Sequence, residues 1–393
     1  MPRMKQYPFV KIYPVFNGTC VLLSTADGKY ILIDCKLTKT AEDPKSVTHY
    51  NVKGDLVDIL PRNSYGAPYV DLFILTHPDY DHCHGFENNF FTGAPGKYSK
   101  SDEEAELIMI NELWTSKIIY GEVCDDAQCI RRELDRRRSL YNSTDHLTGS
   151  DYNRMSMIGY DDDDKFTSCP SYYPGDLVKY IAGTTCKYTE LFIHGPFKKS
   201  LIQATATEDR NVASVMIHYR LSSPDHSKTL RLIEGGDADH YQWKAAKEKS
   251  EEHGNTEFLY FDVMIASHHC SWSYYNDRPY AKHTIPQRSS CELIETYMLP
   301  NGFIISSSKE IVNDEDNPPH HPAKQQYIKD MPSDGTFLCT GEEPTRAEPK
   351  PIVLELTADG VVKKNTATVK TASRNKAQRN FLLTNPGYRS YGM

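Results

Sequence analysis

Four side chains that can bind metal ions occur within six residues, in the segment His77-Pro78-Asp79-Tyr80-Asp81-His82. Imidazole and carboxylate groups crowded on one turn would repel one another or lack hydrogen-bond partners if they were buried alone. A divalent cation removes both costs, because it binds these groups directly. The alternative is a solvated acidic turn, and the spacing favours the metal site.

Further His and Asp residues follow later apolar segments of the chain. His194 follows residues 190–193, Asp237 lies in a Gly-Gly-Asp segment after residues 230–234, and His268 and His269 follow residues 261–266. Strands of an α/β protein deliver catalytic groups to one edge at such positions. A single His at a strand end is more often structural, but the recurrence along the chain indicates a shared site.

The order of these residues resembles the metallo-β-lactamase superfamily, whose motif reads His-x-His-x-Asp-His, then a later His, an Asp and a final His. More narrowly, the chain is similar to the soluble hydrolase domain of ComEC-type DNA-uptake proteins, which have His-x-Asp-x-Asp-His and a His-His-Gly-Ser ending. Here the ending reads His268-His269-Cys270-Ser271. Two departures lie near the expected site: Cys270 stands where Gly is usual, and residues 17–20 read Asn-Gly-Thr-Cys instead of Gly-Gln-Gly-Asp.

The resemblance implies an α/β fold, the αββα four-layer metallo-β-lactamase sandwich with a helical insertion, and two divalent metal ions. It assigns seven ligands: His77, Asp79 and His194 to one ion, Asp81, His82 and His268 to the other, and Asp237 as the bridge. An Asp at position 79, where lactamase-type members have His, makes one pocket richer in oxygen. We therefore expect manganese to support turnover, with zinc as the alternative.

Four residues are expected to take part in proton transfer or in positioning the ligands, and of these only Asp81 is also expected to bind metal. Asp81 is expected to orient the attacking hydroxide, and His320 or His321 to protonate the leaving group. The His pair before Pro322 suits a helix start equally well. Asp34, at the end of an early strand pattern, is expected to support the ligands through hydrogen bonds rather than bind metal.

The expected function is metal-dependent hydrolysis of phosphodiester bonds by an activated hydroxide, as a nuclease or nucleotide phosphodiesterase, with a nucleic acid or nucleotide as substrate. The resemblance selects the phosphodiester. The alternatives are an ester, lactone or thioester hydrolase on the same fold, and a non-catalytic regulatory partner in a multi-protein system.

Chain length favours one domain. The resemblance implies a hydrolase domain over residues 5–362, interrupted at about 87–188 by an insertion that offers a surface for protein partners and followed by a basic tail over residues 363–393. Net charge is −8, but residues 360–393 contain seven basic and no acidic side chains. That tail suits either steering of a phosphate polymer or simple solvation. Ten cysteines without paired spacing, no signal peptide and no bilayer-length apolar run predict a cytoplasmic protein without a membrane segment.

Hydrophobic periodicity predicts the elements that position these residues. We expect an opening hairpin over residues 9–35, a strand at 69–75, and helices at 102–117 and 125–141 inside the insertion. Strands are expected at 189–193, 213–219, 229–233 and 262–265, and helices at 242–252 and 322–330. A hairpin at 351–362, turning at Asp359-Gly360, is expected to close the second sheet.

Three further patterns each have two interpretations. The five arginines at positions 131, 132, 136, 137 and 138 form either a phosphate-tracking helix face or, as their interleaved acids favour, a solvated one. Trp272, Tyr274 and Tyr275 either stack on bases or pack internally. The acidic run at residues 161–165 is expected to be a disordered loop.

Overall fold

The structure is a computed structural model, and it describes residues 7–43, 45–121, 123–142, 149–159, 169–207 and 209–364. Two large β-sheets account for most of its strands. Each sheet is mixed, with antiparallel strands on one side and parallel strands on the other.

The first sheet has nine strands in the order β18-β17-β1-β2-β3-β4-β5-β6-β7. Pairing is antiparallel from β18 to β3 and parallel from β3 to β7. The strands are β1 Phe9–Ile12, β2 Val21–Ser24, β3 Tyr30–Ile33, β4 Tyr69–Ile74, β5 Met109–Ser116, β6 Arg154–Ile158, β7 Ser171–Tyr172, β17 Ile352–Thr357 and β18 Gly360–Lys363.

The second sheet has seven strands in the order β16-β15-β14-β13-β12-β11-β8, antiparallel from β8 to β13 and parallel from β13 to β16. A small hairpin, β9 with β10, stands apart. The strands are β8 Leu177–Val178, β9 Tyr180–Ile181, β10 Thr184–Thr185, β11 Thr189–Gly195, β12 Met216–Ser222, β13 Thr229–Glu234, β14 Phe261–Ile265, β15 Met298–Ser306 and β16 Thr336–Cys339.

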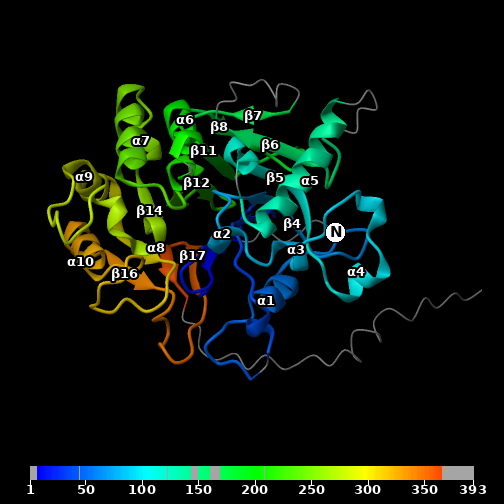
Figure 1. Cartoon of the computed structure of the whole chain (residues 1–393), viewed down its shortest axis with the longest axis horizontal. Helices are drawn as coiled ribbons and strands as arrows, with labels where there is room; N and C mark the ends of the chain where they lie inside the picture. Colours follow the sequence, from blue (N-terminus) through cyan, green and yellow to red (C-terminus); the bar gives the residue numbers. More distant parts are fainter. Residues whose placement is uncertain are drawn as a thin grey trace, which may run out of the picture.

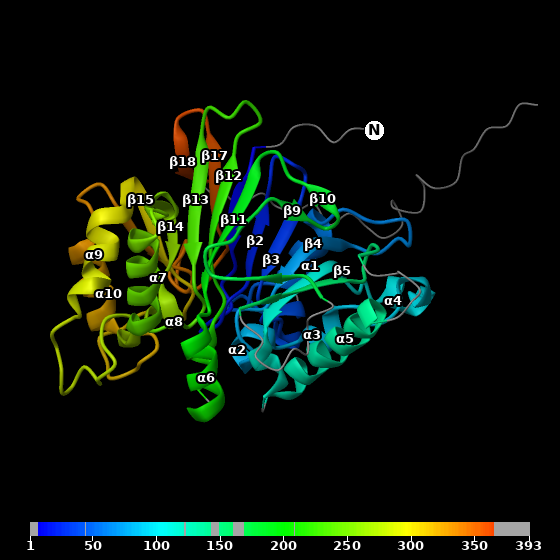
Figure 2. The same ribbon diagram turned by 90° about the horizontal axis from the view of Figure 1, so that it is seen from above.

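The two sheets pack face to face, and helices cover their outer faces (Figure 2). The core between the sheets takes buried side chains from both, such as Val21 and Ile31 from one and Leu191 and Ile217 from the other. A second apolar cluster joins the first sheet to α1 (Val52–Ile59) and α5 (Asp125–Asn142). A third joins the second sheet to α7 (His240–Glu252), α9 (Arg288–Tyr297) and α10 (His321–Asp330). The molecule is therefore a mixed α/β protein whose sheets and helices form a sandwich.

The helices are α1 Val52–Ile59, α2 Tyr80–Cys83, α3 Phe86–Asn89, α4 Lys100–Glu104, α5 Asp125–Asn142, α6 Lys198–Thr207, α7 His240–Glu252, α8 Ser267–Cys270, α9 Arg288–Tyr297 and α10 His321–Asp330. Short 3-10 segments are η1 Lys39–Glu42, η2 Pro95–Lys97, η3 Lys117–Tyr120, η4 Asn211–Ala213, η5 Thr256–Phe258 and η6 Trp272–Tyr274. Within the described ranges, no helix combines the length and apolar character needed to cross a lipid bilayer.

Most predicted elements are present, including the opening hairpin, the strand at β4, and helices α5, α7 and α10. The helix predicted at 102–117 is wrong, because only α4 is helical there and β5 follows it. The polar residue Glu112 lies inside this buried strand, so the sequence does not show an apolar strand pattern there. Its carboxylate is satisfied inside the protein by Trp114 Nε1 at 2.6 Å and the Ala182 backbone N–H at 2.7 Å.

Two sheet assignments also change. The C-terminal hairpin forms as predicted, but β17 pairs with β1, so the hairpin extends the first sheet and not the second. The range predicted as an insertion contributes β5 and β6, which lie within the first sheet, so the sheet runs through this range. The acidic run at 161–165 and residues 365–393 of the basic tail lie outside the described residues.

The arginine-rich helix face of α5 is held by contacts within the protein. Arg137 is 2% exposed, and it donates to Glu133 Oε1 at 2.7 Å and to the Ile110 carbonyl at 2.9 Å. Arg136 also pairs with Glu133, and Arg138 pairs with Asp135. Neither predicted interpretation describes Arg137, which anchors the helix to the sheet.

Candidate metal centre

The motif from His77 to His82 begins three residues after β4 and continues into α2. β4 lies between parallel neighbours β3 and β5, so its carboxyl end opens at the same edge as theirs. His77 and His82 are fully buried there. In Figure 1 α2 lies near the centre of the view, and α8 lies to its left.

Asp34, which directly follows β3, organises this turn. One carboxylate oxygen accepts from the Thr76 backbone N–H at 2.7 Å, and the other accepts from Thr76 Oγ1 at 2.6 Å and His82 Nδ1 at 2.7 Å. Because a carboxylate only accepts, His82 carries its hydrogen on Nδ1 and presents Nε2 to the site. Asp34 makes the hydrogen bonds expected of it, and its support of a metal-bound His82 stays a prediction.

Asp237 reaches the site on the loop after β13. Gly236 before it has φ +52°, and a Cβ atom there would lie 2.8 Å from Thr76 Oγ1, so the position requires glycine. Its backbone N–H donates to Glu234 Oε1 at 2.6 Å. Burial, reinforced by nearby Asp34, raises the pKa of Glu234 to about 8. Glu234 therefore anchors the loop that carries Asp237.

The last two histidines lie on a left-handed turn. His268, His269 and Cys270 have φ values of 48°, 52° and 69°. Consecutive left-handed residues other than glycine are uncommon and costly, at roughly 1–2 kcal/mol each. The turn directs both imidazoles toward Asp237, and the φ of Cys270 accounts for the usual glycine at this position in the family that the sequence resembles.

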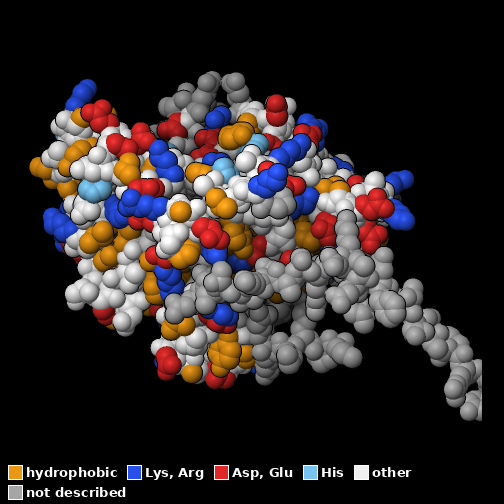
Figure 3. Space-filling model, turned by 90° about the horizontal axis from the view of Figure 1, so that it is seen from below, with side chains coloured by type: hydrophobic (Ala, Val, Ile, Leu, Met, Phe, Trp, Pro, Cys, Tyr) orange, Lys and Arg blue, Asp and Glu red, His pale blue; other side chains and the backbone are white. Residues whose placement is uncertain are grey.

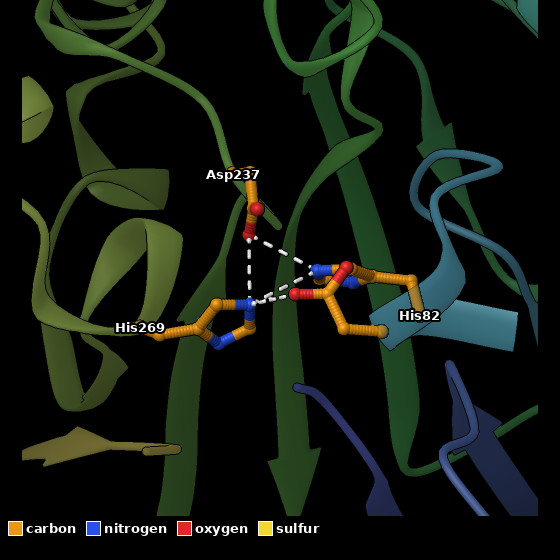
Figure 4. A group of neighbouring side chains, drawn as sticks. His82, Asp237 and His269 are labelled. Carbon is orange, nitrogen blue, oxygen red and sulfur yellow. Dashed lines mark hydrogen bonds and ion pairs between the residues drawn. The ribbon is translucent and has the colours of Figure 1, made fainter. Parts of the chain in front are cut away.

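Three ligand atoms cluster around Asp237 Oδ1, and we call the residues that supply them, Asp81, His82 and His269, the Oδ1 group. His82 Nε2 lies 3.1 Å from Asp237 Oδ1 and 3.3 Å from His269 Nε2, which is 3.1 Å from Asp81 Oδ2 (Figure 4). Such spacings match the roughly 3.4 Å between donors that surround a metal at about 2.0–2.2 Å. These four residues could hold a metal ion.

The other oxygen of Asp237 has its own neighbours, and we call His77, Asp79 and His268 the Oδ2 group. Asp237 Oδ2 lies 3.6 Å from His77 Nε2 and 3.5 Å from His268 Nε2, and His77 Nε2 is 3.9 Å from Asp79 Oδ2. The far oxygen of Asp79 pairs with Arg210. This group is wider than the Oδ1 group.

All four imidazoles present Nε2 to Asp237 because Nδ1 is engaged elsewhere. His269 Nδ1 donates to the Ser307 carbonyl at 3.0 Å. His77 Nδ1 lies 3.1 Å from Thr76 Oγ1, which donates onward to Asp34. His268 Nδ1 lies 3.1 Å from Ser273 Oγ, whose hydroxyl in turn donates to Ser271. Such hydrogen bonds to Nδ1 are typical of metal-binding histidines.

Two atoms at the centre fit a metal better than they fit the protein alone. His77 Nε2 and Asp237 Oδ1 are buried and make no hydrogen bond of good geometry, although the His82 imidazole lies 3.1 Å from Asp237 Oδ1. Burial would raise the pKa of Asp237, but His82 and the other imidazoles hold it well below its usual value. Burial would lower the pKa of His82, but Asp237 and Asp34 hold it well above its usual value. The metal-free group therefore retains charge in a buried place, a cost that a cation removes.

Six of the seven predicted ligands lie at this site: Asp237 itself and the five residues around it, His77, Asp79, Asp81, His82 and His268. The seventh, His194, lies elsewhere. His194 Nε2 bonds the Phe258 carbonyl at 3.0 Å, and Nδ1 lies 3.4 Å from Ser250 Oγ. It lines a separate cavity of about 530 Å³ beside α7. The assignment of His194 as a ligand is therefore corrected: β11 delivers it to the outer face of the second sheet.

The assignment within the His-His pair is also corrected. The resemblance placed His268 with Asp81 and His82, but His269 occupies that place, and His268 faces the other oxygen of Asp237. In the sequence the two are adjacent and equally spaced from β14. Only the left-handed turn decides which one faces which group.

The predicted proton donors, His320 and His321, stand at the start of α10, and the His320 backbone N–H donates to the carbonyl of Cys270, next to His269, at 3.0 Å. His320 precedes α10 and packs its ring against Trp272 and Tyr280, and His321 lies 3.5 Å from Gln325. Their helix-start interpretation is the one that the structure bears out. Trp272, Tyr274 and Tyr275 are at most 2% exposed in the third apolar cluster, so they pack internally and offer no face to a base.

Two cations near the site were missed from the sequence. Arg210 pairs with Asp79, and Lys36 donates its Nζ to the Asn17 carbonyl while its Cδ and the Asp81 carbonyl lie against Gly18. Burial lowers the pKa of Lys36, although Asp81 opposes this. Lys36 lies only two residues after Asp34, and that proximity was the one available signal.

Comparison with models of known protein families gives no match, and comparison with curated proteins gives none either. The function must therefore be inferred from the residues of this chain.

Proposed function

We propose that this protein is a metallo-β-lactamase-type hydrolase that uses two divalent metal ions to cleave phosphodiester bonds, as a nuclease or nucleotide phosphodiesterase. One observation supports this most: a buried aspartate presents a separate oxygen to each of two His/Asp groups. A carboxylate that bridges two ions about 3.5–4 Å apart requires this arrangement.

The superfamily assignment is supported by the arrangement of the fold around the site. Two packed sheets with helices on both outer faces agree with an αββα sandwich. The ligand motif follows a central parallel strand, and the later ligands arrive on loops after β13 and β14, which are themselves parallel. The one expected ligand that does not join the site is His194.

Each group has a distinct part in the proposed reaction. Two divalent ions would supply an activated hydroxide and hold the oxygens of the scissile phosphate. His82 and His269 are fixed by Asp34 and the Ser307 carbonyl, so they orient the Oδ1 group. Asp81, with one oxygen 3.1 Å from His269 Nε2, is placed to accept the proton of the attacking water.

Charge favours an anionic substrate over a neutral ester. Asp79, Asp81 and Asp237 oppose two dications and leave a formal charge of +1, which a bridging hydroxide brings to zero. Lys36 and Arg210 then make the neighbourhood positive. The face drawn in Figure 3 mixes acidic, basic and hydrophobic side chains.

The test is elemental analysis of purified protein joined to assays on single-stranded DNA, RNA, bis-p-nitrophenyl phosphate and p-nitrophenyl esters. We expect two transition-metal ions per chain, phosphodiester turnover, and higher activity with manganese than with zinc, because Asp79 adds a hard oxygen ligand. Turnover of esters alone would replace the proposal with the ester hydrolase alternative. Protein that binds no metal under any of these conditions would overturn it.

A further inference from the structure

Two thiols, those of Cys83 and Cys124, contact the backbone of the segment from His77 to His82. Cys83, the last residue of α2, and Cys124, which immediately precedes α5, have their sulfur atoms 3.4 Å apart. Cys83 Sγ also donates to the Asp79 carbonyl at 3.1 Å, and Cys124 Sγ lies 3.9 Å from the Pro78 carbonyl. The pair therefore contacts the backbone of the very turn that carries the candidate ligands.

The two cysteines differ in exposure and environment. Cys83 is buried, and Cys124 is partly exposed. Cys124 stands at the start of an 18-residue helix, where free N–H groups favour a negative charge. The neighbouring Cys83 thiol, together with the Ala127 backbone N–H, lowers the pKa of Cys124 to about 7. An accessible, acidic thiol next to a buried one is the usual arrangement of a reactive cysteine and its resolving partner.

We propose that Cys83 and Cys124 form a peroxide-sensitive dithiol, a modification site that closes to a disulfide. In the first step the sulfur of Cys124 attacks hydrogen peroxide. An S–O bond forms, the O–O bond breaks, and a sulfenic acid and one water result. The sulfur of Cys83 then attacks that of Cys124, the S–S bond forms, the S–O bond breaks, and a second water leaves. One peroxide is reduced and two thiols are oxidised.

Closing the disulfide moves the metal motif. The sulfur separation must fall from 3.4 Å to about 2.05 Å, and Cys83 loses the hydrogen that it donates to the Asp79 carbonyl. His82 is the neighbour of Cys83 in the short helix α2. A shift of the Cys83 backbone on disulfide closure therefore also shifts the His82 imidazole. Misplacement by about 1 Å costs roughly 10²-fold in rate at a catalytic site. This effect on activity rests on the proposed function; the disulfide itself does not.

The modification is tested on the full-length protein, first reduced and freed of reductant, then treated with hydrogen peroxide. A non-reducing tryptic digest analysed by mass spectrometry should contain the Cys83 peptide linked to the Cys124 peptide, and dithiothreitol should separate them. Cys124→Ser should abolish the linkage. Cys291→Ser, which changes another buried thiol far along the chain, should leave it intact. Recovery of free thiols at both positions, or linkage of either to a different cysteine, would overturn the proposal.

A second measurement separates the regulatory effect from the chemistry. After peroxide treatment, the activity or the metal content of the wild type should fall by about 10-fold or more and should recover on reduction. The activity and metal content of Cys124→Ser should not change on the same treatment. If the disulfide forms and metal content and activity are unchanged, the modification stands and its regulatory role is refuted. If the protein has no hydrolase activity, peptide mapping still tests the disulfide, and metal content still tests its effect on the metal centre.

Discussion

The Oδ1 and Oδ2 groups are built from the same residue types, yet they differ in how they are braced. The Oδ1 histidines donate directly to a carboxylate and a backbone carbonyl, and their ligand atoms lie 3.1–3.6 Å apart. The Oδ2 histidines rest on serine and threonine hydroxyls that pass the hydrogen bond onward, and their separations are 3.5–3.9 Å.

This difference has a thermodynamic consequence. A carboxylate partner makes the imidazole a more basic ligand and fixes its orientation, whereas a hydroxyl can rotate and does neither as strongly. Arg210 also competes with a metal for the charge of Asp79 in the Oδ2 group. We therefore expect the Oδ1 group to fill first and hold its ion more tightly.

Asp237→Ala should have the largest effect, because it removes the residue that the two groups share. We expect loss of both ions and of all measurable turnover, with the fold retained because both sheets keep their cores. Elemental analysis, circular dichroism and the phosphodiester assay measure this. Asp277→Ala, an exposed carboxylate in the same half of the chain, is the matched control and should behave as wild type. Normal activity of Asp237→Ala would show that the ligands are wrongly assigned.

Substituting the two adjacent histidines distinguishes the groups. His269→Ala removes a ligand from the tighter group and should lower activity by about 10²-fold or more, with one ion lost on dialysis. His268→Ala should weaken only the second ion, by roughly 10–100-fold in Kd, and added metal should restore most activity. Metal titration by calorimetry checks both variants. If the ordering is reversed, the bracing argument fails.

The same residues explain what the sequence could and could not predict. The cluster from His77 to His82 and the Gly-Gly-Asp segment are local patterns, and they identified Asp237 and its first partners. The choice between His268 and His269 depends on three left-handed residues in a row, which no periodicity reports. Arg210 reaches the site through a tertiary contact alone, since Asp79 lies 131 residues before it in sequence.

The errors in the fold have the same origin. Parallel strands buried on both faces lack alternation, so β5, with polar Glu112 inside it, was mistaken for helix. The hairpin of β17 and β18 was found from its turn, but the sheet it joins depends on pairing with β1, more than 300 residues away in sequence. Local sequence patterns identify helices and strands better than they identify which strands pair with each other.

Bracing by Asp34 should appear in the pH dependence of metal binding. His82 has a raised pKa in the metal-free protein, so its stabilising contribution is present below the unfolded pKa and is lost as pH rises through the folded value. Metal must displace that proton from Nε2, so the gain in Tm on adding zinc should grow as pH rises from about 6 to 9. Thermal denaturation with and without zinc measures the gain.

Asp34→Asn sharpens the same point. The amide keeps the shape but removes the charge that supports His82, so metal affinity should fall by roughly 10–100-fold and the pH dependence should flatten. Asp71→Asn is a matched control, since Asp71 is also a buried carboxylate of the first sheet but pairs with Lys29 away from the site. If Asp34→Asn binds zinc as tightly as the wild type, the hydrogen bond from His82 to Asp34 is not the reason for tighter metal binding by the Oδ1 group.

His194→Gln should have the smallest effect on the site. The glutamine can still donate to the Phe258 carbonyl, so we expect a loss of about 1 kcal/mol in unfolding free energy with metal content and turnover unchanged. Burial lowers the pKa of His194 to about 4, so protonation of the unfolded chain destabilises the wild type as pH falls from about 6.5 toward 4. The variant should lack that part of the acid sensitivity in thermal denaturation. Loss of an ion from His194→Gln would instead return this histidine to the metal centre, as the family pattern has it, and the Oδ2 group would need a different composition.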